Sequence, residues 1–449
     1  MIALLLVGVA LALLAAVHFF WVAEGRVIFG PESFFLALAL GTYGASAFLA
    51  GPVSRPYVLY LGAGIAAFLL GTMASRLFHR FEHRRELAAF TAAPWQDDLR
   101  GARCALVVAL ALFSLVVTAS YFYLLGFYVP LAALRTLVSD GPQAMIATYN
   151  QLRAATSSAA GAYLGLGYVS QFKDTLLPLI TILFFFRWRL QRDRVSRAVF
   201  LVLMGCTALA AVGTGARFHL AFFGASLTVM GLAPYMRPLR FSRRQMVVVA
   251  VVLMTVLSAL TLMMGARGMK TLDVPILWAP YQVVERAFIS PSEQRLEVYE
   301  RFLVEQPPQW GLATLRELRS ILPGRLPVTL SNQLHELLFG SPYGNVALDT
   351  WGALWYDFQW LGVLVAFAIG FLMNAYYVWM LRGPKRLVRL VTLGYAGLIL
   401  GISTDLQVLI LHGFLTCFLF LAVLAFGESL GWLQRWEDKR LSDSAPAGA

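Results

Sequence analysis

The sequence is poor in charged residues and in cysteine, and it lacks the signature motifs of most soluble enzymes. Only 13% of its 449 residues are charged, and three are cysteines. Cys104, Cys206 and Cys417 lie in or beside apolar runs and show neither a disulfide framework nor metal-ligand spacing, so we expect them to pack. The chain also has no Walker loop, dinucleotide fingerprint, His-Glu-x-x-His or acidic nucleotide-sugar motif. We therefore predict no metal site and no cofactor.

Long apolar runs dominate the sequence and place it in a membrane. Hydrophobic residues make up 59% of the chain, and several runs exceed the roughly 20 residues that cross a bilayer as a helix. The runs do not alternate with a period of two, so helices are favoured over a β-barrel. We predict an all-α polytopic membrane protein with about eleven transmembrane helices and one large helical extracytoplasmic loop. The expected spans are 1–22, 33–50, 57–75, 104–128, 165–186, 198–213, 218–236, 245–265, 350–381, 388–403 and 405–427.

The basic residues predict how the chain crosses the membrane. Of the 36 Lys and Arg, 23 fall near 76–103, 187–197, 237–244 and 382–389, at Arg26 and in the C-terminal tail. The positive-inside rule places these segments in the cytoplasm, with the N-terminus and the long loop outside. The net charge of +12 is then explained by topology and by contact with anionic lipids. It does not indicate nucleic-acid binding, because the basic residues are spread over loops without an aromatic platform.

Four regions follow from this topology. They are an N-terminal transmembrane bundle of eight helices (1–265), an extracytoplasmic loop domain (266–345), C-terminal transmembrane helices (346–430) and a cytoplasmic tail (431–449). Within the first region, the outer segment 129–164 is expected to form short amphipathic helices at the membrane surface.

The loop domain holds the densest mixture of charged residues and is predicted to be helical. Apolar residues at helical spacing predict one helix with Ser292 as its N-cap and with Pro307 as its stop. A second helix is expected to follow Trp310 and to end at Pro323 and Gly324.

Two signatures in the sequence resemble those of a known family of membrane enzymes. GTGARFHL at 213–220 is a glycine-rich break before an arginine at the outer end of a membrane helix. The second signature consists of two segments, WGLATLRELRSILPGRLP at 310–327 and SPYGNVALDTWGALWYDFQWLGVLVAFAIG at 341–370. Together they resemble a family pattern in which a Pro-Arg turn leads into a helix that ends in Asp-Phe-Gly, two further residues and Gly. Here Gln359 replaces the first of these glycines and Gly362 keeps the second. The chain is thus similar to the Wzy-type polymerases of O-antigen, capsule and exopolysaccharide repeat units.

The resemblance implies a glycosyltransferase, related in fold to O-antigen ligases, in the bacterial inner membrane. Its active site would face the periplasm or the cell exterior. Such an enzyme transfers the growing glycan from undecaprenyl diphosphate to the acceptor hydroxyl of a new lipid-linked repeat unit, without a nucleotide sugar or a metal. The implied partners are the undecaprenyl-diphosphate-linked donor and acceptor oligosaccharides, membrane lipids and, as a further candidate, a chain-length regulator protein.

Arginines are the candidates for binding the diphosphate. Departure of a diphosphate develops negative charge, which guanidinium groups match with bidentate geometry. Arg217 is the first candidate because the family motif falls on it beside the glycine-rich break, and Arg267 follows a membrane helix at the same outer boundary. The further candidates in the loop are Arg295, Arg301, Arg316 and Arg325. Snorkelling to lipid headgroups, a solvated helix face and ion pairs with nearby glutamates are the alternatives.

The acceptor hydroxyl must lose its proton, which calls for a histidine or a carboxylate nearby. His335 is the only histidine of the long loop, with capping or a surface position as its alternative. Asp349 and Asp357 lie eight residues apart, roughly on one face of the next helix. Asp357 has a structural contact as its alternative. His219, two residues after Arg217, is a weaker candidate because a lone histidine on an apolar helix usually packs.

Three aromatic residues are candidates for stacking on sugar rings. Trp310, Trp351 and Tyr356 surround the predicted mouth of the site, although anchoring at the membrane interface explains them nearly as well.

Two other functions remain open on the sequence. The first is a sister enzyme, an O-antigen ligase or protein oligosaccharyltransferase, which differs in its acceptor. The second is a non-enzymatic flippase or transporter of lipid-linked glycans. Such transporters usually have two similar halves and polar residues at mid-membrane. The sequence has no visible internal repeat, and its polarity lies at the outer rim, so the polymerase is favoured.

Overall fold

The computed structural model describes residues 2–22, 24, 29–141, 143–145, 147–149, 151–152, 155, 169, 171–214, 217–240, 242, 244–245, 247, 285–319, 330–340, 350–402 and 413–444. Within these ranges the regular structure is entirely helical, apart from an isolated bridge between Gln96 and Arg386. In chain order the helices are α1 (Ile2–Val17), η1 (His18–Val22), α2 (Pro31–Leu49), α3 (Arg55–His79), α4 (His83–Ala92), α5 (Gly101–Leu125), α6 (Val129–Asp140), η2 (Gln171–Leu176), α9 (Leu177–Gln191), α10 (Arg194–Gly213), α11 (Arg217–Leu232), η3 (Pro234–Met236), η5 (Glu285–Ile289), α14 (Ser290–Val298), η6 (Tyr299–Leu303), α15 (Leu312–Arg319), α16 (Leu330–Phe339), α17 (Thr350–Phe358), η7 (Gln359–Leu361), α18 (Gly362–Arg382), α19 (Leu387–Ile402) and α21 (Phe414–Ser444).

The helices are those of a membrane protein by their length and composition. Among the described residues, five helical stretches are long and apolar enough to cross a bilayer: Pro31–Leu49, Arg55–His79, Gly101–Leu125, Arg194–Gly213 and Thr350–Arg382. Shorter apolar stretches accompany them at Leu4–Phe20, His219–Leu232, Leu387–Ile402 and Phe414–Ser429. Each predicted span overlaps a helix except 245–265, nearly all of which lies outside the described residues. The total of eleven crossings stays a prediction.

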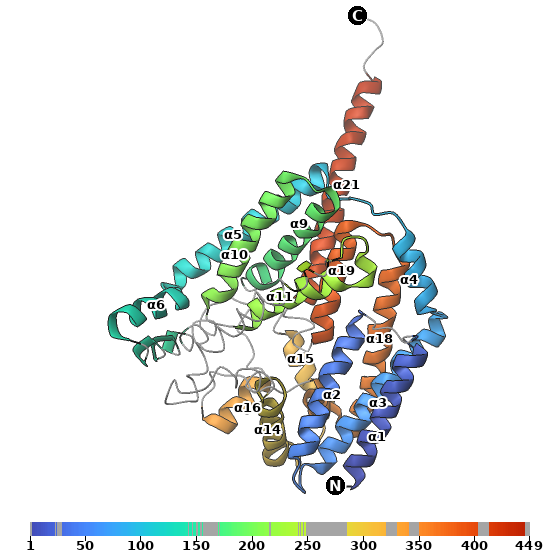
Figure 1. The fold of residues 1–449 in the computed structure, drawn as a ribbon, viewed down its shortest axis with the longest axis vertical. Coiled ribbons are helices and arrows are strands. Elements are labelled where there is room, and N and C mark those ends of the chain that lie inside the picture. Colours follow the sequence, from blue (N-terminus) through green and yellow to red (C-terminus); the bar gives the residue numbers. More distant parts are fainter. Residues whose placement is uncertain are drawn as a thin grey trace, which may run out of the picture.

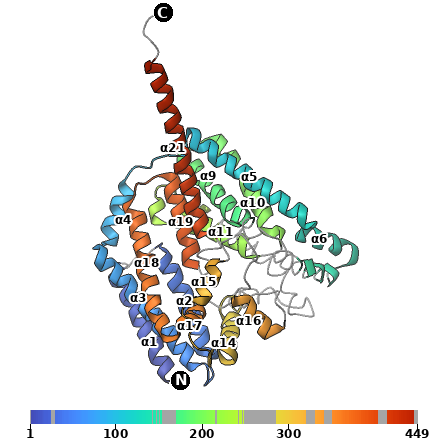
Figure 2. The ribbon, with the colours of Figure 1, turned by 180° about the vertical axis from the view of Figure 1, so that it is seen from behind.

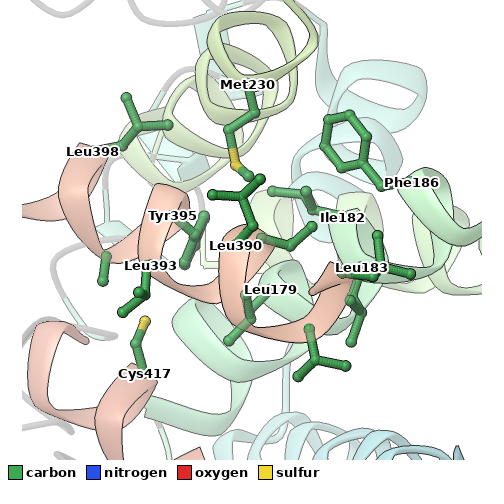
Figure 3. Close-up of a cluster of buried hydrophobic side chains, with 14 of the residues drawn as sticks. Leu179, Ile182, Leu183, Phe186, Met230, Leu390, Leu393, Tyr395, Leu398 and Cys417 are labelled. Atoms are coloured by element: carbon green, nitrogen blue, oxygen red, sulfur yellow. The ribbon is translucent and has the colours of Figure 1, made fainter. Parts of the chain in front are cut away.

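Two hydrophobic cores organise these helices. The first is built by α5, α9, α10, α11, α19 and α21, and Figure 3 shows its centre, where leucines of α9 and α19 lie beside Met230 and Cys417. Cys417 is fully buried there, so the packing role predicted for it is confirmed. The second core joins α1, α2, α3, α17 and α18 to the helices of the loop domain.

Glycines bring α3 and α18 into close contact although they are far apart in the sequence. A Cβ atom on Gly71 would collide with the backbone of Phe367, and one on Gly370 would collide with the backbone of Phe68. Small residues let helix backbones approach closely where no hydrophobic effect drives them together. This contact fixes α18 on the N-terminal bundle. It thereby also positions α17, which directly precedes α18 in the chain.

The basic segments predicted to share one side of the membrane meet at one end of the molecule. The Trp95 indole donates to the Arg237 carbonyl over 2.9 Å, and the Gln96 amide donates to the Lys385 carbonyl over 3.1 Å. The last helix, α21, leaves from this end toward the C-terminus, whereas the N-terminus lies at the opposite end (Figures 1 and 2). Opposite ends are what an odd number of crossings requires.

The described helices of the loop domain, α14, α15 and α16, lie at the end away from the C-terminus (Figure 1). Leu296, Tyr299 and Leu334 bind them to the second core. The prediction that Ser292 caps the first of these helices is wrong. Ser292 is buried inside α14, because the π-helix η5 runs directly into α14 and the chain is already helical at Glu285. We call these three helices with η6 the cap.

Candidate functional site

Three predicted site residues, Arg267, Arg325 and Asp349, lie outside the described residues. Arg217 is the first residue of α11, and its side chain lies outside the described part of the chain. The roles assigned to these four residues stay predictions.

Asp357 caps a helix of the loop domain. Its two carboxylate oxygens accept hydrogen bonds from the backbone N–H groups of Ala313 and Thr314, each over 3.0 Å, and from the Thr314 hydroxyl over 2.6 Å. These amides are the ones near the start of α15 that an N-cap side chain satisfies. Gly311 precedes the helix and has no side chain for this purpose, so Asp357 supplies the cap from α17. The geometry favours the structural alternative for Asp357.

The turn that follows Asp357 gives a physical reason for the glycine pattern in the sequence. Gln359 has a φ of 48°, in the left-handed region that favours glycine. Its side-chain amide donates to the Gln306 carbonyl over 2.9 Å, which holds the strained residue in place. A Cβ atom on Gly362 would collide with the Tyr60 hydroxyl. The first position therefore tolerates another residue with a compensating bond, and the second requires glycine.

The three aromatic candidates occupy different surroundings. Trp310 is 66% exposed, and its backbone N–H donates to the Asp357 carbonyl over 2.7 Å. Tyr356 is half-buried next to Asp357. Trp351 is buried in the second core, where its indole fills the space left by Gly64. Only Trp310 of these three presents most of its ring to a ligand.

The remaining described candidates lie on the cap. Arg301 is exposed and pairs with Glu297 over 2.7 Å, which is the ion-pair alternative and contributes little to stability. Arg295 is buried in α14. His335 is half-buried in α16, with its ring centroid 4.8 Å from that of Phe339. Arg295 and His335 are on different helices, and their catalytic or binding roles stay predictions.

A polar cluster that sequence reasoning did not assemble lies where η2 meets α11. The Lys173 ammonium is 2.5 Å from Oδ1 of Asp174, and the same oxygen is 3.6 Å from Nδ1 of His219. The side chains of Lys173 and Asp174 are 4% and 12% exposed, whereas that of His219 is 29% exposed. We call these three residues the acid–base cluster. Ionisable side chains within membrane helices are costly and commonly functional.

A proline explains the backbone that presents the acid–base cluster. Pro178 in the first turn of α9 has no N–H to donate to the carbonyl of Asp174, so the α-helical ladder cannot continue upstream. The preceding turn, η2, is a π-helix. Such widened turns inside α-helices are frequent at functional sites.

The widened turn directs its consecutive side chains to three different helices. Lys173 lies 5.9 Å from the ring centroid of Tyr121 on α5, Asp174 faces α11, and Thr175 packs against Gly413 at the start of α21. Gln171 on the same turn accepts a hydrogen bond of 2.7 Å from the Thr416 hydroxyl. The cluster is therefore held rigidly by α5, α11 and α21.

The acid–base cluster lies on the side of the bundle that faces the cap. Residues 177–186 of α9, about 15 Å of helix, separate it from the basic segment 187–197. Figure 1 shows the start of α9 directed toward the cap and away from the C-terminal end. Arg217 begins α11 only two residues before His219. The GTGARFHL signature and the buried Lys-Asp pair thus meet in one place.

The chemistry available at this cluster is proton transfer and binding of anions. An imidazole beside a carboxylate can take a proton on one nitrogen while the other nitrogen faces the anion. Neither Lys173 nor Asp174 was among the site residues predicted from the sequence. The available signal was a Lys-Asp pair one turn before a proline inside an apolar run. Among the described residues, no group of three or more His, Cys, Asp and Glu is arranged to hold a metal ion.

Comparisons of the chain with protein-family models, with curated proteins and with solved structures gave no match.

Proposed function

We propose that the chain is an integral-membrane glycosyltransferase that polymerises undecaprenyl-diphosphate-linked oligosaccharide repeat units on the outer face of a bacterial inner membrane. The donor is the growing lipid-linked glycan, and the acceptor is a sugar hydroxyl of a new lipid-linked unit. The observation that carries the proposal is the acid–base cluster inside the helix bundle, at the start of the helix that begins with Arg217.

The position of the cluster suits a substrate whose carrier is a lipid. A polyprenyl chain can reach a site between membrane helices from the bilayer, while the oligosaccharide extends toward the polar cap. Cations are required where the diphosphate departs, because negative charge develops on its oxygens. Arg217 and, from the segment beyond α11, Arg267 are the proposed ligands of those oxygens, since a guanidinium matches them in a bidentate manner.

Deletion of the gene tests this proposal in cells. A polymerase is supported if the deletion strain still carries single repeat units at its surface but carries no glycan longer than one repeat unit. An unpolymerised surface glycan would not arise from loss of a ligase, which leaves polymer on its lipid carrier. Retention of full-length surface polymer in the deletion strain contradicts the proposal.

A transporter of lipid-linked glycans is the second candidate, because one observation favours it. Glu32, Arg76 and Asn374 form a buried polar group between α2, α3 and α18, in which Asn374 Nδ2 is 3.2 Å from Glu32 Oε1 and the Arg76 guanidinium interacts electrostatically with the Glu32 carboxylate. We call these three residues the enclosed cluster. Transporters use such intramembrane charges along their pathways. Loss of all glycan from the outer face in the deletion strain would support this candidate.

A further inference from the structure

We propose that Asp174 and His219 act as a proton-accepting pair, in which His219 takes the proton of the acceptor sugar hydroxyl and Asp174 orients the imidazole. This assignment rests on the proposed function and pairs His219, which lies in the GTGARFHL signature, with Asp174, which lies outside both sequence signatures. Three observations carry it: the approach of the two side chains, the partial exposure of the His219 side chain, and the rigid support of Asp174.

The approach of the two side chains determines which nitrogen of the His219 ring carries the hydrogen and which one accepts a proton. Nδ1 of His219 lies 3.6 Å from Oδ1 of Asp174, so the carboxylate favours the tautomer in which Nδ1 carries the hydrogen. Nε2 is then the basic nitrogen on the other side of the ring. The separation of 3.6 Å is longer than a hydrogen bond, and catalytic contacts often tighten only when the substrate binds.

Access distinguishes His219 from its partners. The imidazole is 29% exposed, whereas the Asp174 carboxylate is 12% exposed. A substrate hydroxyl can therefore meet the histidine without displacing the carboxylate. Asp174 is a positioning residue in this scheme, and His219 is the catalytic one.

Lys173 stabilises the pair. Its ammonium is 2.5 Å from the carboxylate oxygen that also faces His219, so it forms a salt bridge with Asp174 beside the histidine. Among the described residues, Tyr121 on α5 and Tyr395 on α19 interact electrostatically with the Asp174 carboxylate, and the Cys417 thiol on α21 interacts with Tyr395.

The acceptor oxygen forms a bond to the anomeric carbon of the donor glycan as the bond between that carbon and the diphosphate oxygen breaks. The electron pair of the broken bond stays on the lipid diphosphate. The hydroxyl proton moves to Nε2 of His219, and the imidazolium that results is stabilised by Asp174 until the proton passes to water.

The test uses membranes that contain the full chain and, as substrate, the lipid-linked oligosaccharide extracted from cells lacking the gene. Formation of lengthened lipid-linked glycan is measured as a function of pH for the wild type, for H219Q and for D174N. The matched control is H79Q, in which the altered histidine lies at the other end of the bundle, in the last turn of α3. Correct folding is checked by the melting temperature of each purified variant.

We expect H219Q and D174N each to lose roughly 100-fold in rate, as for the removal of a general base. The melting temperature of H219Q should stay near that of the wild type. D174N should also melt lower, because it leaves the buried Lys173 ammonium without its charge partner. The wild-type rate should fall as the pH drops through the range in which imidazole is protonated, and the residual rate of H219Q should lose this dependence. H79Q should keep both the rate and the pH profile.

Two results would overturn different parts of the account. A wild type that does not lengthen the oligosaccharide rejects the proposed function, and the proton-accepting pair with it. A wild type that lengthens the oligosaccharide while H219Q keeps its full rate and its pH profile rejects the pair alone. If H219Q and D174N are slow but retain the wild-type pH profile, the two residues are structural and the proposal is equally wrong.

Discussion

The enclosed cluster and the acid–base cluster are both groups of ionisable or polar side chains inside an apolar bundle, but they differ in access. In the enclosed cluster Glu32, Arg76 and Asn374 are 1%, 7% and 0% exposed. In the acid–base cluster the exposed fraction of the side chain rises from 4% at Lys173 to 12% at Asp174 and 29% at His219. A group that is sealed on all sides can hold helices together, whereas a group that opens at one member can also meet a substrate. Access, more than charge, separates a structural cluster from a candidate site.

The surroundings of the two clusters support the same distinction. The enclosed cluster joins α2, α3 and α18 with regular α-helical backbone on each side. The acid–base cluster is carried by a π-helical turn, beside a glycine-rich break at the start of α11. Regular helices suit a permanent contact, and irregular backbone inside a membrane bundle suits a binding site.

Removal of Arg76 should have the largest effect and should act on stability. R76L leaves the Glu32 carboxylate buried without its charge partner, which costs about 3–5 kcal/mol when a buried pair is broken. Thermal melting in detergent measures this loss. The exposed Arg85, which pairs only with Glu82 at the surface, gives the control R85M with little change.

The double variant E32Q/R76L sharpens the comparison. Replacing both charges removes the unpaired ion, so we expect most of the stability and the glycan-lengthening activity to return. A stable double variant without activity would show that the enclosed cluster has a chemical role, and the contrast between the two clusters would fail.

The matching double variant of the acid–base cluster should behave in the opposite way. In K173M/D174N the buried charge pair is removed as a unit, so stability should stay close to that of the wild type. Activity should still fall roughly 100-fold, equivalent to about 2.7 kcal/mol of transition-state stabilisation. The measurement is the rate of glycan lengthening beside the melting temperature. Full activity of this variant would place both clusters in the structural class.

Asp357, like the residues of the enclosed cluster, should affect stability and not the chemical step. D357A removes the acceptor for two amides at the start of α15, which we expect to cost about 1–3 kcal/mol locally. Hydrogen exchange should then accelerate at Ala313 and Thr314. D357N keeps one side-chain oxygen as an acceptor and should keep most of the activity. An inactive D357N with normal amide protection would instead make Asp357 a chemical group of the site.

The smallest predicted effect concerns a helix cap far from both clusters. Asp193 precedes α10, and its carboxylate accepts a hydrogen bond of 2.6 Å from the Ser196 amide. Burial alone would raise the pKa of Asp193, but the hydrogen bonds from Ser196 and the charge of Arg187 bring the pKa below its usual 3.8. D193A should therefore cost about 0.5–1 kcal/mol at neutral pH.

The pH dependence of this cap has a definite sign. Because the folded pKa lies below the unfolded value, the contribution of Asp193 is complete above about pH 4 and is lost as the pH falls through the folded pKa. Melting curves of the wild type and D193A should converge toward low pH. A difference that grows on acidification would contradict this sign.

The class of fold could be predicted from the sequence because helix formation and membrane insertion depend on residues close together in the chain. Runs of apolar residues indicated the membrane helices, and the distribution of Lys and Arg grouped loops that the structure brings into contact through Trp95 and Gln96. Local rules failed at Ser292, where a π-helical turn upstream continues into α14 and removes the need for a cap.

The candidate site could be predicted only in part, because its contacts join distant segments. His219 was visible in the sequence beside Arg217, but its neighbour Asp174 is 45 residues earlier on another helix. The hydrogen bond by which Asp357 caps the start of α15 likewise joins two residues, Asp357 and Ala313, that are 44 positions apart. Trp351 was predicted as a stacking candidate, but it is buried in the second core, where Gly64 makes room for its ring. Such pairings depend on tertiary packing and leave no periodic signal.

The most direct test of the central claim is reconstitution of the purified chain in liposomes with the lipid-linked oligosaccharide taken from cells that lack the gene. We expect a ladder of lipid-linked glycans that lengthens by whole repeat units, with release of lipid diphosphate in equal number. Unchanged oligosaccharide, whether left in place or moved across the bilayer, would contradict the proposed polymerase activity.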